Sequence, residues 1–135
     1  MAVRFILQNP VPERVGWGYF GEIFDEENAP VPASAFSVLQ VSKIYVEDAA
    51  LTEIVAVPAS ILNAGRGTLD AAGNLTIIWL PGDSVIVNAT SEISITGTRR
   101  RVKGERHVAL LEGLYATGRE FAREIAWDVV NLAKR

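Results

Sequence analysis

The chain has 135 residues, of which 49% are hydrophobic and 21% charged, and 13 basic against 16 acidic side chains give a formal net charge of -3. A chain of this length can bury a self-sufficient core, so the composition predicts one globular domain. The sequence contains no cysteine and a single histidine, His107. These counts exclude disulfide scaffolds, thiolate metal sites and cysteine nucleophiles, and they leave only His107 for a serine-type triad.

Residues 1–16 are expected to form an extended N-terminal arm, followed by a single domain over residues 17–135. Val3, Phe5 and Leu7 alternate along the arm before two prolines hold it extended. This pattern fits a segment that binds the sheet edge or groove of a neighbour, and the alternative left open is the first strand of the domain's own sheet. The apolar run is too short for a secretory signal and no stretch is long enough to span a bilayer, so we expect a chain made in the cytoplasm with no membrane partner.

Several segments between the arm and residue 96 follow the all-β pattern, in which short runs of β-branched and aromatic residues are separated by turns. In the second of these segments, residues 36–47, apolar side chains occur at both parities, which predicts burial on both faces or a bulge near Gln40. A Gly/Asn turn at residues 71–74 predicts a hairpin. The predicted strands are 17–24, 36–47, 51–57, 68–70, 75–80 and 92–96.

The last thirty residues decide the fold class. A helix over about 119–133 would carry an apolar stripe beginning at Phe121, and the fold would then be α+β. Alternatively, residues 107–116 and 121–132 form two strands joined at Thr117-Gly118. Local propensity favours the helix, whereas consistency with the preceding strands favours the hairpin, because a sandwich needs long strands to close its core.

The turns and strands from residue 17 to residue 133 also follow a recognisable order. The matching elements are Phe24-Asp25-Glu26-Glu27-Asn28-Ala29-Pro30-Val31, Ile61-Leu62-Asn63-Ala64-Gly65, Thr68-Leu69-Asp70-Ala71-Ala72-Gly73-Asn74-Leu75-Thr76, Leu80-Pro81-Gly82-Asp83, His107-Val108-Ala109-Leu110-Leu111-Glu112 and Glu124-Ile125-Ala126-Trp127-Asp128-Val129-Val130-Asn131-Leu132. This order resembles that of small bacteriophage virion proteins with an immunoglobulin-like β-sandwich. The resemblance implies that fold, the hairpin at the C-terminus, and a structural component used in many copies in the virion.

The station in the particle is not implied by the resemblance. The sandwich pattern and the lack of catalytic groups favour a capsid decoration or cement subunit that binds the assembled shell. The first alternative is a neck or tail ring subunit. A second alternative is a small carbohydrate-binding or hydrolase domain on a sandwich scaffold, with the three Trp and three Tyr residues as a sugar platform.

Charge and aromatic residues predict where partners bind. Residues 1–60 carry a net charge of -5 and residues 61–135 a net charge of +2, which suits packing between identical copies. The basic cluster at 99–106 could contact phosphate or an acidic protein face, and the favoured alternative is a solvated loop between two strands. Nucleic acid is disfavoured because the whole chain is acidic and no aromatic residues are interleaved with the cluster. The predicted partner-binding residues are Val3, Phe5, Leu7, Trp17, Tyr19, Arg99, Arg100, Arg101 and Lys103.

No catalytic, cofactor-binding or metal-binding residues are predicted. Residues 16–21 match G-x-G-x-x-G, but no helix is expected to follow them, so the glycines are interpreted as letting Trp17, Tyr19 and Phe20 lie against a neighbouring surface or as permitting a bulge. The acidic run at 25–27 lacks the spacing of a calcium loop. His107 is interpreted as a residue at the edge of a strand, because no motif supplies a nucleophile or an orienting group.

Overall fold

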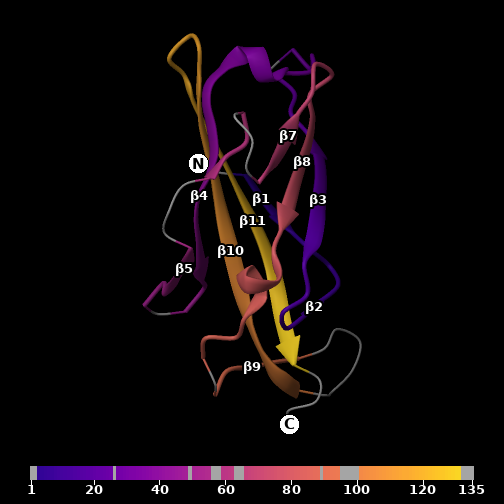
Figure 1. Ribbon diagram of the computed structural model, residues 1–135, viewed down its shortest axis with the longest axis vertical. Helices are drawn as coiled ribbons and strands as arrows, with labels where there is room; N and C mark the ends of the chain where they lie inside the picture. Colours follow the sequence, from indigo (N-terminus) through magenta and orange to yellow (C-terminus); the bar gives the residue numbers. More distant parts are fainter. Residues whose placement is uncertain are drawn as a thin grey trace.

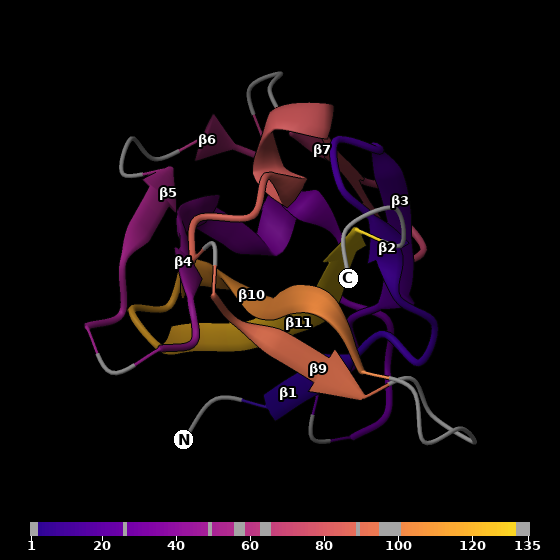
Figure 2. The ribbon, with the colours of Figure 1, turned by 90° about the horizontal axis from the view of Figure 1, so that it is seen from below.

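A computed structural model describes residues 3–25, 27–48, 50–55, 59–62, 66–88, 90–94 and 101–131. Across these residues the structure is all-β, with an eight-stranded sheet and a three-stranded sheet (Figure 1). Seen along the long axis, the strands β3 and β7 of the small sheet lie apart from β10 and β11 of the large sheet (Figure 2). The predicted sandwich-like fold is therefore confirmed. No helix in the described residues is long and apolar enough to cross a membrane.

The two sheets are ordered β1-β11-β10-β4-β5 and β3-β8-β7, and the short strands β2, β6 and β9 pair with β11, β4 and β10. Two short 3-10 turns, η1 and η2, complete the described elements. The large sheet comprises β1 (Val3–Ile6), β2 (Val11–Pro12), β4 (Phe36–Val46), β5 (Glu53–Val55), β6 (Ala59–Ser60), β9 (Glu92–Ser94), β10 (Arg101–Tyr115) and β11 (Glu120–Asn131); the small sheet comprises β3 (Trp17–Glu22), β7 (Gly67–Leu69) and β8 (Asn74–Trp79); η1 spans Ala33–Ala35 and η2 spans Pro81–Ser84.

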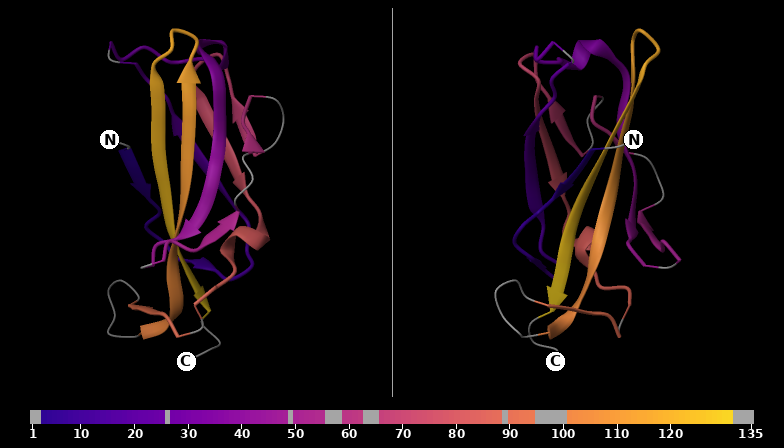
Figure 3. Two further views of the ribbon diagram at one scale, coloured as in Figure 1. Left: turned by 90° about the vertical axis from the view of Figure 1, so that its left-hand side faces the viewer. Right: turned by 180° about the vertical axis from the view of Figure 1, so that it is seen from behind.

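The C-terminal residues form the long hairpin β10–β11, so the alternative of a helix over about 119–133 is wrong for residues 120–131, which form β11. The two strands run almost the whole length of the molecule (Figure 3). Ile125, Trp127 and Val129 point into the core at a spacing of two residues and are fully buried. A sheet face buries all three side chains at once, which outweighs the local helix propensity.

Strand β4 has apolar side chains at both odd and even positions, and two register shifts in its pairing with β10 allow both sets to face the core. One falls beside Ser37, between the pairs Leu114–Val38 and Tyr115–Phe36, and the other beside Ser42, between the pairs Leu111–Val41 and Leu110–Lys43. Each extra residue reverses which side chains face inward. The prediction of a bulge near Gln40 is therefore confirmed within two residues, and the buried residues switch from Phe36 to the pair Leu39 and Val41, and then to the pair Ile44 and Val46.

The N-terminal segment belongs to the domain's own sheet. Strand β1 pairs in parallel with β11 over Val3–Arg123 to Ile6–Ala126, and β2 pairs in parallel with the same strand further along. Val11 is buried in the core. Of the two interpretations left open for residues 1–16, the structure thus has the strand of the domain's own sheet, and the described part of this segment is not an arm extended away from the domain.

Candidate interaction surfaces

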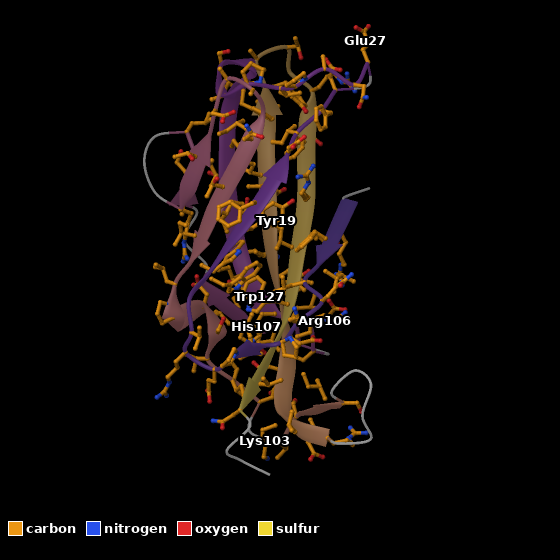
Figure 4. All side chains as sticks on the ribbon, turned by 90° about the vertical axis from the view of Figure 1, so that its right-hand side faces the viewer. Tyr19, Glu27, Lys103, Arg106, His107 and Trp127 are labelled. Atoms are coloured by element: carbon orange, nitrogen blue, oxygen red, sulfur yellow. The ribbon has the colours of Figure 1, made fainter. Side chains whose placement is uncertain are left out.

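The single histidine lies inside the sandwich, in a network of buried polar groups. His107 is in the middle of β10, not at a strand edge as predicted, and it is fully buried beside Trp127 (Figure 4). Its Nδ1 lies 2.8 Å from the carbonyl oxygen of Asp83, and its Nε2 lies 2.6 Å from a carboxylate oxygen of Glu105. Because a carbonyl oxygen only accepts hydrogen bonds, Nδ1 carries a proton.

The partners of His107 leave it no free nitrogen for catalysis. The Glu105 carboxylate also accepts hydrogen bonds from the backbone N–H groups of Val87 (2.8 Å) and Asn88 (2.7 Å). The buried Ser84 hydroxyl accepts a hydrogen bond from Trp127 Nε1 at 3.1 Å, whereas the two imidazole nitrogens are bonded to Asp83 and Glu105. These contacts attach the segment after η2 to β10, so the network is a structural one and provides no serine-type triad.

Asp83 extends this network toward the small sheet. Its carboxylate forms a bidentate ion pair with Arg66 and accepts a hydrogen bond from the backbone N–H of Leu80 at 2.8 Å. The carboxylate of Asp83 is almost completely buried. The hydrogen bond from Leu80 to the Asp83 carboxylate holds the start of η2 in place.

The outer face of the large sheet is divided into two halves, and its lower half, near β9, is covered by paired charges. Arg4 binds Glu47 at 2.7 Å and Glu124 at 3.3 Å, and Arg106 binds Asp128 at 2.9 Å. Burial, together with the hydrogen bond that its hydroxyl donates to Glu124 at 3.1 Å, raises the pKa of Tyr45 above its ordinary value. Charged groups on β1, β10 and β11, and Glu47 directly after β4, are thus paired within the chain.

The upper half of the same face, toward the β10–β11 turn, contains a shallow groove of about 340 Å³. Two cross-strand rows form it: Val38–Leu114–Glu120 and Gln40–Glu112–Ala122. The apolar side chains of Val38 and Leu114 are 42% and 38% exposed. We name this feature the hairpin-end groove; it is lined by Val38, Gln40, Glu112, Gly113, Leu114, Glu120, Phe121 and Ala122.

The outer face of the small sheet carries the most exposed large apolar side chain among the residues that the structure describes. Phe20 on β3 is 78% exposed, and Ile78 on β8 is 48% exposed. Phe20 pairs with Thr76 and Gly18 pairs with Ile78, so Phe20 and Ile78 are diagonal neighbours on one face. A hollow of about 280 Å³ adjoins Phe20. We name these two side chains and the hollow beside them the small-sheet face.

The G-x-G-x-x-G match is explained by packing. A Cβ on Gly16 would lie 2.8 Å from the backbone oxygen of Trp79, one on Gly18 would lie 3.3 Å from the Phe20 ring, and one on Gly21 would lie 2.5 Å from the Tyr19 ring. The motif is followed by strand residues and not by a helix. Gly18 and Gly21 therefore leave room for the Phe20 and Tyr19 rings of their own strand, and Gly16 allows a close approach to the backbone of Trp79.

Most of the predicted partner-binding residues lie elsewhere than expected. Tyr19 is only 6% exposed and Trp17 packs against Trp79 and Trp127, so the prediction that these two residues form a contact surface is wrong. Leu7 packs against the core. Phe5 contacts the Tyr19 ring at 5.0 Å between centroids and keeps part of its surface exposed, while the side chain of Val3 lies outside the description.

The described part of the basic cluster is a strand. Arg101 and Lys103 belong to the start of β10, which corrects the expectation of a loop over these positions, and Arg99 and Arg100 lie outside the described residues. The predicted partner-binding residues do not include Phe20, which is the exposed aromatic side chain of β3. The signal for it was alternation, because a residue next to the inward-facing Tyr19 in a strand must face outward.

Trp79 and Trp127 are fully buried and Trp17 is partly buried against them, which removes the sugar platform on which the carbohydrate-binding alternative relied. Among the described residues there is no group of three or more His, Cys, Asp or Glu side chains placed to hold a metal ion. No protein-family model, curated protein or solved structure matches the chain. The assignment of function therefore depends on the surfaces described above.

Proposed function

We propose that the protein is a structural subunit of a bacteriophage virion, assembled in the host cytoplasm, and that it acts as a capsid decoration or cement subunit on the assembled shell. The observation that carries this proposal is the exposed small-sheet face, with Phe20 at its centre. An exposed aromatic side chain beside a hollow is typical of a protein contact site, and aromatic residues dominate the energy of such contacts. Partners of this kind are other virion proteins, and no chemistry is required of the subunit.

The shape of the surface around Phe20 supports a role in docking. Its ring extends over Gly18, which has no side chain to cover it, and the adjoining hollow offers a complementary depression for a partner's side chain. In the described part of the chain, the buried histidine and its carboxylate partner are both occupied in holding segments together. These features support a binding role for the domain and provide no support for a hydrolase.

Co-sedimentation with shells that lack the protein tests this proposal. The wild-type protein should sediment with the shells, and Phe20→Asp should weaken binding by more than about tenfold, since it places a charge in an apolar contact. Leu51→Asp is the matched control, because Leu51 is an exposed apolar residue that lies outside the small sheet. Failure of the wild-type protein to bind any shell would overturn the cement proposal.

A neck or tail ring subunit remains the second candidate, on the same exposed face. The stoichiometry in purified virions separates the two stations. A closed ring would contain about six or twelve copies, whereas a decorated shell would contain hundreds.

A further inference from the structure

We propose that the hairpin-end groove of one copy binds the basic end of a second copy, so that the chain associates head to tail. The basic end is the start of β10 beside β9, with Arg101 and Lys103. The proposal rests on the proposed function, in which many copies of the chain occur together, and it identifies the partner as the same chain. The contact is separate from the small-sheet face, which lies on the other sheet.

The groove is an apolar surface left open on a sheet whose other half is covered. Val38 and Leu114 face each other across β4 and β10, and both are more than a third exposed. Among residues 3–6, which the structure describes, strand β1 pairs with β11 from Arg123 to Ala126 and not at the groove positions 120–122. A partner that covered this floor would bury apolar side chains that the chain itself leaves in water.

The charges of the groove point to a cationic occupant. Glu112 and Glu120 are diagonal neighbours on the paired strands β10 and β11, since Glu112 faces Ala122 and Glu120 faces Leu114. Both are exposed, and within the described residues neither carboxylate forms an ion pair. Like charges on diagonal neighbours of two paired strands repel each other until a cation binds between them.

The opposite end of β10 carries the complementary charge. Arg101 and Lys103 begin the strand, and Arg101 is exposed. In the described residues of β9 and the part of β10 that pairs with it, Arg101 and Lys103 are basic and Glu92, opposite Lys103, is acidic. Lys103 and Glu112 are nine residues apart in one strand, which corresponds to about 30 Å. Figure 4 shows Lys103 at one end of the molecule and Glu27, a residue outside the groove, at the other end.

The distance between the groove and the basic end excludes a contact between these two surfaces within one copy. The two complementary surfaces lie on one continuous, fully paired strand, so a single copy cannot bring its basic end to its own groove. A second copy can, and the contact then joins two different surfaces. Such a heterologous contact repeats from copy to copy and gives a closed ring or an open row.

Sedimentation velocity of the intact chain tests the proposal. The wild-type protein should associate as its concentration rises, and the association should weaken when salt is raised from about 50 mM to about 500 mM, because screening weakens contacts between exposed charges. Glu112→Arg and Arg101→Glu should each weaken association by more than about tenfold. Glu120→Arg provides a second groove variant, and circular dichroism with thermal melting verifies that each variant is folded.

A mixture of the two variants is the decisive measurement. The Arg101→Glu copy keeps a native groove and the Glu112→Arg copy keeps a native basic end, so the 1:1 mixture should associate although neither variant does so alone. Glu53→Arg and Arg14→Glu are controls, since they change the same charges at exposed positions outside both surfaces, and they should associate as the wild type does.

Three results would overturn the inference: a monomeric wild-type protein at every concentration, a mixture that fails to associate, or an Arg101→Glu variant that associates as well as the wild type. The last result would mean that the groove binds itself or a different protein. Shell binding by a protein that stays monomeric would overturn the head-to-tail contact alone, and head-to-tail association without shell binding would overturn the cement proposal alone.

Discussion

The two halves of the large sheet's outer face are built from the same strands, yet they treat charge in opposite ways. In the lower half, Glu124 forms an ion pair with Arg4 and accepts a hydrogen bond from the Tyr45 hydroxyl, and Asp128 forms an ion pair with Arg106. In the upper half, Glu112 and Glu120 have no such partner among the described residues, and they border exposed apolar side chains. The difference teaches that the same hairpin contributes stability at one end and an open surface for binding at the other.

The interior behind the lower half should show the largest response to mutation. Glu105→Ala removes the acceptor of two backbone N–H groups and of the His107 ring, all of them in the buried network. Removing this carboxylate leaves several buried polar groups without a hydrogen-bond partner, so we expect a loss of about 3–5 kcal/mol in the free energy of unfolding, measured by urea denaturation. Glu112→Ala, on the same strand in the groove, should change it by less than about 0.5 kcal/mol. Equal losses would contradict the division into two halves.

Tyr45 connects the outer face to pH. Tyr45→Phe removes the hydrogen bond to Glu124 and should cost about 1 kcal/mol at neutral pH. Burial and this hydrogen bond raise the pKa of Tyr45 above its ordinary value of 10.0, so the neutral hydroxyl stabilises the folded state. This stabilisation is fully present below pH 10 and is lost as the pH rises through the folded-state pKa. Unfolding measured from neutral to strongly alkaline pH should therefore show a steeper loss in the wild type than in Tyr45→Phe. Identical slopes would contradict the role assigned to this hydroxyl.

The ion pair between Arg106 and Asp128 should have a smaller effect. Both side chains remain partly exposed, so solvent screens their attraction. A double-mutant cycle with Arg106→Leu and Asp128→Leu should give a coupling energy of about 0.5 kcal/mol that decreases in high salt. A coupling energy near zero at low salt would show that the pair is only a geometric feature.

The groove carboxylates should have the smallest effect on stability, and in the opposite direction. Glu112→Gln and Glu120→Gln relieve repulsion between like charges, so the melting temperature should stay constant or rise slightly, corresponding to at most about 0.5 kcal/mol. Glu124→Gln is the matched control in the lower half, where neutralising a paired carboxylate should lower the melting temperature. A clear destabilisation by the groove variants would mean that these glutamates are part of the fold.

The Trp17–Tyr19 segment shows how far local pattern extends. Alternation predicted a strand there, and the structure has β3 over these residues. Alternation does not say which of the two faces meets the other sheet, so Tyr19 was assigned to the surface although it is buried and Phe20 is exposed. The direction of a strand's faces depends on the position of the opposite sheet, which is a property of the whole fold.

The sequence by itself determined the β-rich pattern before the last thirty residues, the hairpin around Gly73 and the absence of cysteine, because these follow from composition, residue alternation and turn residues. Local pattern left a C-terminal helix open, and the pairing of β11 with β10 decided against it. The tertiary structure alone decided that His107 is a buried hydrogen-bonding residue, that residues 3–12 pair with β11, and that Glu112 and Glu120 share a groove. Each of these depends on contacts between residues far apart in the chain. The sequence shows which side chains are present, whereas register and layer packing determine which of them meet.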